Sequence, residues 1–317
     1  MLPKSLTSFL ASAADAAIES VLTGGGARTP RPTGEVTAVR TMTLDGFDEI
    51  ATRWSPILKS AGYRIDLRSV FCHSRPHVTF APVPHPKLSG GKTPRQCELA
   101  DLLIVIDHID PVQGIDDRRA VLVQAKLLKG GKIKPSGAEW VQHELLGWLP
   151  KFTFVDASYD TRPREFRGCP MVGRPIFSAE YGGVDLKAKP PVWRQELTQT
   201  TAPWFKSQIP LADFLANMAT GGRSCSRKAI RGGGDDWSFT VDELLRITGA
   251  RPVTLKNSAV LRRNDNVVGF ISDTSQSFGS GVGGRIDITE GDEPDWPQGP
   301  ISTVHTIIRS LDDRSEE

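Results

Sequence analysis

Residues 98–126 read ELADLLIVIDHIDPVQGIDDRRAVLVQAK, and they contain two short apolar runs at positions 102–106 and 120–123. Both runs are rich in β-branched residues, and turn formers that include Pro111 and Gly114 lie between them. Short apolar runs with such boundaries are typical of strands. We therefore predict two strands joined by a hairpin-like connection over residues 107–117.

Polar side chains lie at the ends of these two strands. Asp101 directly precedes the first strand, and Gln124 and Lys126 follow the apolar part of the second. Because side chains alternate between the two faces of a strand, Gln124 and Lys126 point to the same side. An amide beside an ammonium is unusual on a core face, so we interpret the three residues as a candidate site.

The residue types suit phosphodiester hydrolysis. Mg²⁺ prefers oxygen ligands, which the Asp101 carboxylate and the Gln124 amide could supply. A lysine beside them could orient the attacking water or stabilise the charge that develops on the phosphate. The pattern is short, however, and a chance match at the ends of two ordinary strands is the alternative interpretation.

The order Asp101, strand, Gln124-Ala125-Lys126 resembles the PD-(D/E)XK nuclease superfamily. The similarity is to its Gln-x-Lys branch, found in modification-dependent restriction endonucleases and in effector nucleases of bacterial anti-phage systems. It covers about residues 47–156. The resemblance implies an α-β-β-β-α-β core with Asp101 as the metal-binding acid, Gln124 in place of the second acid, and Lys126 as the catalytic lysine.

The sequence departs from the pattern of this superfamily in two ways. Ala100 stands where a proline is usual, and the uncharged Gln124 leaves the site one negative charge short. A further metal-binding carboxylate is therefore expected, and Glu98 and Glu49 are the candidates. Strand alternation places Glu98 opposite Asp101 unless the strand begins after it, which favours Glu49 on the preceding helix.

A basic segment follows the Gln-x-Lys strand. Residues 118–134 contain six cations and no acid, and Gly130 and Gly131 would let the backbone approach a polyanion. We predict nucleic-acid contacts from Arg75, Lys129, Lys132 and Lys134, although a solvated lysine-rich loop is an equal alternative. Gln142 lies on a helix predicted over residues 138–149. In the resembled nucleases such a glutamine lines the site, so we expect it beside the metal ligands.

Composition limits the class of protein. The 317-residue chain has a net charge of only +2, so no global basic field indicates nucleic acid. The four cysteines form no C-x-x-C pair, so we do not expect a zinc site of the ribbon type. A reduced, cytoplasmic setting is the expected one for such cysteines. No apolar run is long enough for a membrane span, and Asp15 and Glu19 interrupt any signal-peptide core.

The remaining pattern predicts an α/β fold with additional α+β elements. We expect helices over residues 5–22, 45–60, 211–219 and 240–248, the last with a capping box from Thr240 to Glu243. Strands are expected over residues 35–43, 63–71, 152–155, 176–181, 267–271 and 303–308. We divide the chain into an N-terminal helix and linker (1–34), a nuclease-like domain (35–190) and a C-terminal α+β region (191–317).

The leading hypothesis is an endonuclease that cleaves DNA with Mg²⁺ or Mn²⁺. A role in anti-phage defence is implied by the resemblance alone. Because such an enzyme endangers its host, a regulatory protein or a homo-oligomer is an expected partner. A ribonuclease, or a catalytically weak nucleic-acid-binding or scaffold protein with the same fold, remains an alternative.

Overall fold

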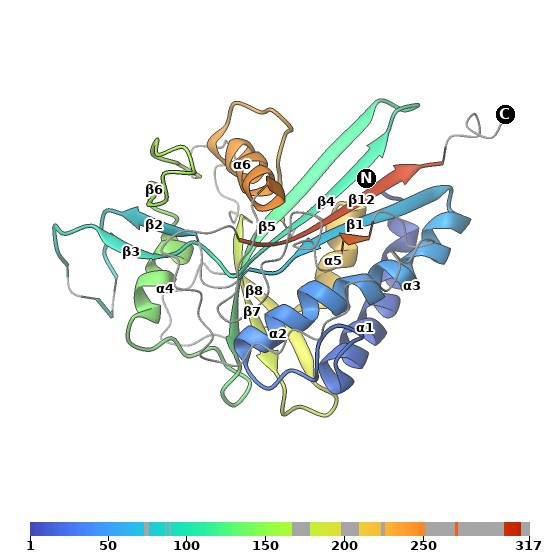
Figure 1. Cartoon of the computed structure of the whole chain (residues 1–317), viewed down its shortest axis with the longest axis horizontal. Helices are drawn as coiled ribbons and strands as arrows, with labels where there is room; N and C mark the ends of the chain where they lie inside the picture. Colours follow the sequence, from blue (N-terminus) through green and yellow to red (C-terminus); the bar gives the residue numbers. More distant parts are fainter. Residues whose placement is uncertain are drawn as a thin grey trace.

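A mixed β-sheet with helices on both faces forms the centre of the molecule (Figure 1). The computed structural model describes residues 1–72, 76–85, 87–88, 90–166, 178–197, 209–222, 226–250, 270–271 and 301–311. The class is α/β, as the sequence predicts.

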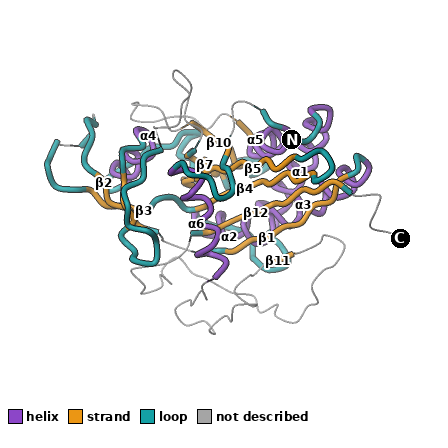
Figure 2. The backbone as a smooth tube through the Cα atoms, turned by 90° about the horizontal axis from the view of Figure 1, so that it is seen from above, coloured by secondary structure: helices purple, strands orange, loops and turns teal. Residues whose placement is uncertain are grey.

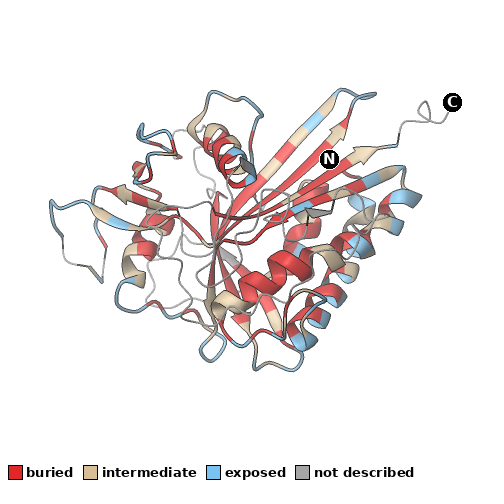
Figure 3. Ribbon diagram, viewed as in Figure 1, coloured by how far each residue is buried: buried red, intermediate tan, exposed pale blue. Residues whose placement is uncertain are grey.

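The strands of the main sheet have the spatial order β11-β1-β12-β4-β5-β7-β8-β9, and β10 pairs with β5. Figure 2 shows the part of this order from β11 to β7. They are β1 (Tyr63–Val70), β4 (Leu102–Asp110), β5 (Ile115–Leu127), β7 (Ala179–Asp185), β8 (Val192–Leu197), β9 (Ile209–Pro210), β10 (Arg227–Lys228), β11 (Phe270–Ile271) and β12 (Ser302–Ser310). Strand β4 runs antiparallel to β5 and parallel to β12, while β5 runs parallel to β7. Because both faces are covered, β4 and β12 are buried along most of their length (Figure 3).

One face of the sheet carries most of the helices. These are α1 (Thr7–Gly24), α2 (Glu35–Thr41), the π-helical turn η2 (Met42–Gly46), α3 (Phe47–Ser60) and α5 (Leu211–Thr220), after the short 3-10 turn η1 (Lys4–Leu6). Apolar side chains of α1, α3 and α5 form one core with the inward residues of the sheet. The Trp54 indole is buried there and donates a hydrogen bond to the Leu10 carbonyl (2.8 Å), which ties α3 to α1.

The opposite face carries α6 (Asp236–Ala250) and a smaller layer. That layer contains α4 (Glu139–Trp148) and a three-stranded sheet of β3 (Arg95–Glu98), β2 (His77–Phe80) and β6 (Phe152–Phe154). Phe152, Phe166 and Trp237 pack there with their rings edge to face. A second hydrophobic core thus lies between the main sheet and the helices α4 and α6.

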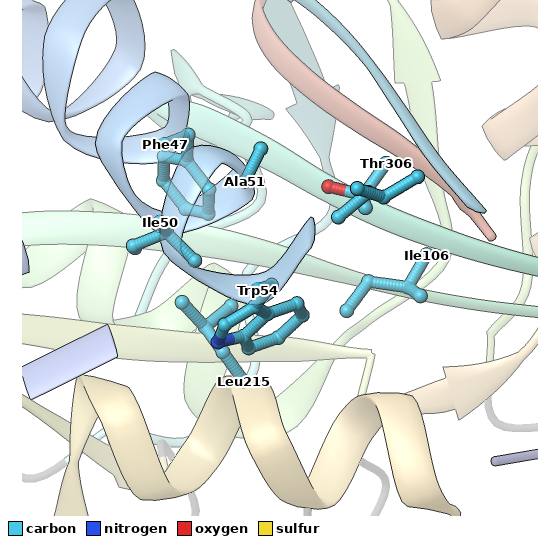
Figure 4. Close-up of a pocket in the computed structure, with 8 residues that line it drawn as sticks. Phe47, Ile50, Ala51, Trp54, Ile106, Leu215 and Thr306 are labelled. Carbon is cyan, nitrogen blue, oxygen red and sulfur yellow. The ribbon is translucent and has the colours of Figure 1, made fainter. Parts of the chain in front are cut away.

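A small apolar cavity lies between α3, α5 and the main sheet (Figure 4). It is lined by Phe47, Ile50, Ala51, Trp54, Ile65, Ile106, Leu215 and Thr306. Its volume of about 10 Å³ is near the lower limit for one water molecule. With an apolar lining and this size, it is a packing imperfection rather than a ligand site.

The strand predicted over residues 35–43 is wrong, because this segment forms the helix α2 and the turn η2. A weak alternation along this segment suggested a strand, but the buried side chains include Ala38, Val39 and Met42, a helical spacing. The Thr37 hydroxyl accepts a hydrogen bond from the Gly34 amide (2.8 Å) and so helps to start the helix. Tertiary burial therefore outweighs local β-propensity here.

The predicted strands over residues 102–106 and 120–123 are confirmed but are longer than expected. Strands β4 and β5 extend through most of the segment that the sequence assigned to their connection, and the turn is confined to residues 111–114. Asp107 pairs with Arg118 across the two strands. The two side chains form a buried ion pair (2.7 Å), so both strands can extend through positions that are occupied by charged residues.

The helix predicted over residues 240–248 begins four residues earlier, at Asp236, so the predicted capping box is wrong. The Asp235 carboxylate accepts a hydrogen bond from the Ser238 amide (3.1 Å) at the true start. Glu243 instead forms a buried ion pair with Arg164 (2.8 Å).

The last described strand lies in the middle of the main sheet. Strand β12 is inserted between β1 and β4, next to the candidate site, although nearly 200 residues separate β4 from β12. Strands β8 and β9 extend the same sheet beyond β7. The sequence-based boundary at residue 190 therefore separates strands that are hydrogen-bonded neighbours.

Candidate active site

Asp101 lies in a bend directly before β4, against the neighbouring strand β5. Its backbone amide donates a hydrogen bond to the Val123 carbonyl (3.1 Å). One of its carboxylate oxygens accepts hydrogen bonds from the Gln124 side-chain amide (2.5 Å) and from the Ala125 backbone amide (2.7 Å). The register of β4 on β5 thus brings together the first two residues of the predicted site.

The Gln124 side chain is buried, and both ends of its amide are used. Its nitrogen donates to Asp101, while its oxygen accepts a hydrogen bond from Gln142 on α4 (2.5 Å). The Gln142 nitrogen also approaches the Glu98 carbonyl (3.5 Å). Gln142 therefore lies beside Gln124, and the Gln124 amide is oriented as a link between Asp101 and α4.

Lys126 is held by two carboxylates that were not predicted from the sequence. Its ammonium lies 2.9 Å from a Glu35 oxygen at the first residue of α2, and 3.3 Å from a Glu139 oxygen at the first residue of α4. The other Glu35 oxygen accepts a hydrogen bond from the Leu127 amide (3.1 Å). The side chains of Lys126, Glu35 and Glu139 are 15%, 28% and 33% exposed, so the cluster is partly desolvated yet open to solvent.

The electrostatics follow from this arrangement. Burial acts to lower the pKa of Lys126, but Glu35 and Asp101 outweigh it, and the pKa is raised above that of a free lysine. Burial raises the pKa of Asp101 above its ordinary value. The negative charges of Glu98 and Glu35 raise this pKa further, and the positive charge of Lys126 only partly opposes the rise. The lysine is therefore an ammonium at neutral pH, a hydrogen-bond donor rather than a base.

The two acids that were expected to supplement Asp101 have different positions. Glu98 at the end of β3 is close enough for its charge to raise the pKa of Asp101. Glu49 forms a surface ion pair with Arg53 one turn further along α3 (2.8 Å). Among the described contacts of Asp101, Gln124 and Lys126, none involves Glu49.

Glu35 on α2, rather than Glu49 on α3, lies beside Lys126. It was missed because residues 35–43 were predicted to form a strand and because 91 positions separate it from Lys126. Glu139 had a usable signal, since it precedes Gln142 by three residues and thus shares one face of the predicted helix. Ser136 donates two hydrogen bonds to its carboxylate (2.8 and 3.1 Å) and fixes its orientation.

The predicted nucleic-acid contacts lie on the turn after β5. Lys129 and Lys134 are exposed and Lys132 is partly exposed. The Lys129 amide donates to the Lys132 carbonyl (2.9 Å), which places these lysines on one tight turn a few residues beyond Lys126. Arg75 lies outside the described residues.

Oxygen donors dominate the site, which suits a hard cation such as Mg²⁺. Within the described part of the chain, no three side chains of the Asp, Glu, His and Cys types form a ready-made metal cage. Mg²⁺ does not need one, because it keeps several waters and is bound through one or two carboxylates and the substrate phosphate. Asp101 and Glu35, both close to Lys126, fit that requirement.

No protein-family model, curated protein or solved structure matches this chain. Among the described helices, none is both long and apolar enough to cross a lipid bilayer.

Proposed function

We propose that this protein is a metal-dependent endonuclease that hydrolyses phosphodiester bonds of DNA. The observation that carries the proposal is the meeting of Asp101, Gln124 and Lys126 at neighbouring strand ends, with Glu35 and Glu139 on the lysine. These residues come from four separate parts of the chain. A metal-phosphate site would explain why so many charged residues meet at the ends of these strands. A structural ion-pair network is the alternative explanation.

Asp101 and Glu35 would hold Mg²⁺ or Mn²⁺, with Glu98 close by. The bound ion polarises the phosphate and lowers the pKa of the attacking water. In hydrolysis the water oxygen bonds to phosphorus, and the bond from phosphorus to the bridging oxygen of the leaving strand breaks. The Lys126 ammonium would donate a hydrogen bond to the phosphate or to that water, and so stabilise the developing negative charge.

Gln124 would act chiefly by positioning Asp101. Its nitrogen already donates to the Asp101 carboxylate, and its oxygen has a second lone pair beyond the one used by Gln142. Because the amide is uncharged, it adds an oxygen donor without repelling Asp101. Direct coordination of the metal by this oxygen would require the side chain to turn from its present orientation.

The role in the cell is a further part of the proposal. The resemblance to anti-phage nucleases supports a defensive function in the bacterial cytoplasm, controlled by a regulatory protein or by a homo-oligomer. The free cysteines Cys72 and Cys97 fit a reducing compartment.

A second candidate is a nucleic-acid-binding protein that keeps the nuclease fold without efficient catalysis. It is favoured by the contacts that already occupy the site: Lys126 is paired with two carboxylates, and both ends of the Gln124 amide are hydrogen-bonded. Cleavage of plasmid DNA and of a single-stranded oligonucleotide in Mg²⁺, Mn²⁺ or EDTA separates the two. A nuclease cleaves at least one substrate only with metal, whereas a binding protein retains both substrates intact and binds them equally well in EDTA.

A further inference from the structure

An aromatic cluster adjoins the candidate site on α4. It consists of His85, Trp140, His143 and Trp148, whose ring centroids lie 5.3–6.0 Å apart in edge-on or tilted contacts. The two imidazoles are buried and share a hydrogen bond of 3.0 Å. The two indoles are partly exposed. The cluster therefore presents tryptophan surface to solvent on a fixed base.

The same helix connects this cluster to the proposed site at two points. Trp140 directly follows Glu139, which contacts Lys126, and His143 directly follows Gln142, which contacts Gln124. Because an α-helix rises about 1.5 Å per residue, Trp140 and His143 lie within about one turn of Glu139. His143 also stacks on Tyr181 (6.3 Å), whose strand position is paired with Gln124.

Packing behind the cluster keeps it in place. Arg95 on β3 forms an ion pair with the buried Glu144 (2.5 Å), and the Val83 amide donates to the same carboxylate (2.7 Å). These contacts fix the segment that carries His85 against α4. The indoles thus need little rearrangement to receive a flat ligand, which limits the entropic cost of binding.

We propose that the exposed indole surface of Trp140, supported by Trp148, is a stacking platform for an unpaired base beside the phosphate that Lys126 contacts. The substrate class is then single-stranded DNA, or duplex DNA with a locally unpaired base. The proposal rests on the proposed function for the position of the phosphate. Aromatic side chains bind bases in this way without sequence preference, while nearby cations follow the backbone. Lys129 and Lys134 supply those cations.

The test is binding rather than cleavage, so it does not depend on catalysis. Anisotropy of a labelled single-stranded oligodeoxynucleotide is measured in EDTA at fixed salt, beside an abasic strand of equal length. The proteins are the wild type, Trp140→Ala, Trp140→Phe and, as an exposed apolar control on α1, Phe9→Ala, whose side chain is 63% exposed.

We expect Trp140→Ala to bind the base-containing strand about 10-fold more weakly than the wild type, within the range for one stacked base. Trp140→Phe and Phe9→Ala should stay within about threefold of the wild type, since both leave an aromatic ring at position 140. The wild type should bind the abasic strand more weakly than the base-containing strand by a similar factor. Trp140→Ala should bind the two strands with equal affinity.

Equal affinity of Trp140→Ala and the wild type for the base-containing strand overturns the platform. An equal loss on both strands also overturns it, because the effect would then not involve a base. If Trp140→Ala loses affinity only for the base-containing strand while the wild type cleaves neither DNA substrate, that result would support the platform and refute the hydrolysis. The two proposals can therefore be refuted independently.

Discussion

The Lys126 ammonium lies 2.9 Å from the Glu35 carboxylate and thereby joins the end of β5 to the first residue of α2. A single lysine at the end of a central strand so connects the main sheet to α2 in the larger helical layer. Removal of Glu35 or Lys126 would leave the other charge partly buried and less well compensated. The pair is therefore the part of the site whose variants are most informative.

Glu35→Gln should weaken metal binding, because it removes one of the two carboxylates, Asp101 and Glu35, that we propose as metal ligands. We expect a loss of roughly 10- to 100-fold in Mn²⁺ affinity, measured by isothermal titration calorimetry. The matched control is Glu49→Gln, which removes a surface carboxylate that contacts only Arg53 among the described residues. A wild-type affinity in Glu35→Gln would exclude Glu35 from the metal site, and a loss of affinity in Glu49→Gln alone would restore Glu49 as a candidate.

Gln124→Glu should make stability depend on metal. The new carboxylate would face Asp101 in place of the amide that now donates to it over 2.5 Å, so repulsion between the two acids should destabilise the metal-free protein. Mg²⁺ between them would relieve that repulsion. Thermal unfolding should show a lower Tm than the wild type in EDTA and a larger rise in Tm with Mg²⁺. An unchanged Tm in EDTA would contradict the geometry described for these residues.

His143 should contribute a pH dependence to stability. Burial lowers the pKa of His143 to about 4 in the folded chain, from 6.5. As the pH falls through 6.5, the unfolded chain takes up a proton that the folded chain accepts only near pH 4. The stabilisation is thus complete above pH 6.5 and is lost as the pH falls to 4, by about 3 kcal/mol.

The measurement is urea unfolding of the wild type and of His143→Phe between pH 7 and pH 4. The difference between the two proteins isolates this histidine from other groups, notably Asp101, whose raised pKa acts in the opposite direction. We expect the advantage of the wild type over the variant to shrink as the pH falls. A constant difference would mean that His143 is not buried as a neutral ring.

Asp107 should be essential for stability although it lies away from the candidate site. Its buried carboxylate contacts Arg118 (2.7 Å), Arg231 (2.7 Å) and His305 (2.5 Å), and so ties β4 to β5, to β12 and to the segment before α6. Asp107→Ala would remove the buried acid of Arg118 and leave this buried guanidinium with the partly exposed Asp242 (2.5 Å) alone among the described acids, at a cost of about 3–5 kcal/mol in the free energy of unfolding.

The control for that variant is Asp116→Ala. Asp116 contacts Arg231 (3.4 Å) but is 55% exposed, so its loss should cost less than about 1 kcal/mol. Urea unfolding of the two variants compares a buried with an exposed partner of the same arginine. Similar losses of stability would show that burial of Asp107 does not govern the strength of this network.

Local patterns in the sequence were sufficient to predict which residues meet at the centre of the candidate site. The alternation of β5 places Gln124 and Lys126 on one face, and the hairpin brings Asp101 against Gln124, as predicted. The helix over residues 138–149 and its Gln142 were also predicted, because an apolar helical period and Pro150 mark that helix clearly. These features depend on neighbours in the sequence.

Long-range contacts explain what the sequence did not reveal. Glu35 reaches Lys126 across 91 positions, and it lies in a segment whose weak alternation suggested a strand. Strand β12 was predicted as an element, but its insertion beside β4 depends on pairing that no local pattern encodes. The ion pairs of Asp107 likewise join β4 to β12 and to a loop far along the chain, and charges give no periodic signal of their partners.

The most direct test of the central claim is cleavage of plasmid and single-stranded DNA by Lys126→Ala beside Lys59→Ala and the wild type, in Mg²⁺ and in EDTA. Lys59 is an exposed lysine on α3, so the pair compares the same substitution inside and outside the proposed site. We expect metal-dependent cleavage by the wild type and Lys59→Ala, and none by Lys126→Ala with an unchanged circular dichroism spectrum. Cleavage by Lys126→Ala at the rate of the wild type would contradict the assignment of the active site.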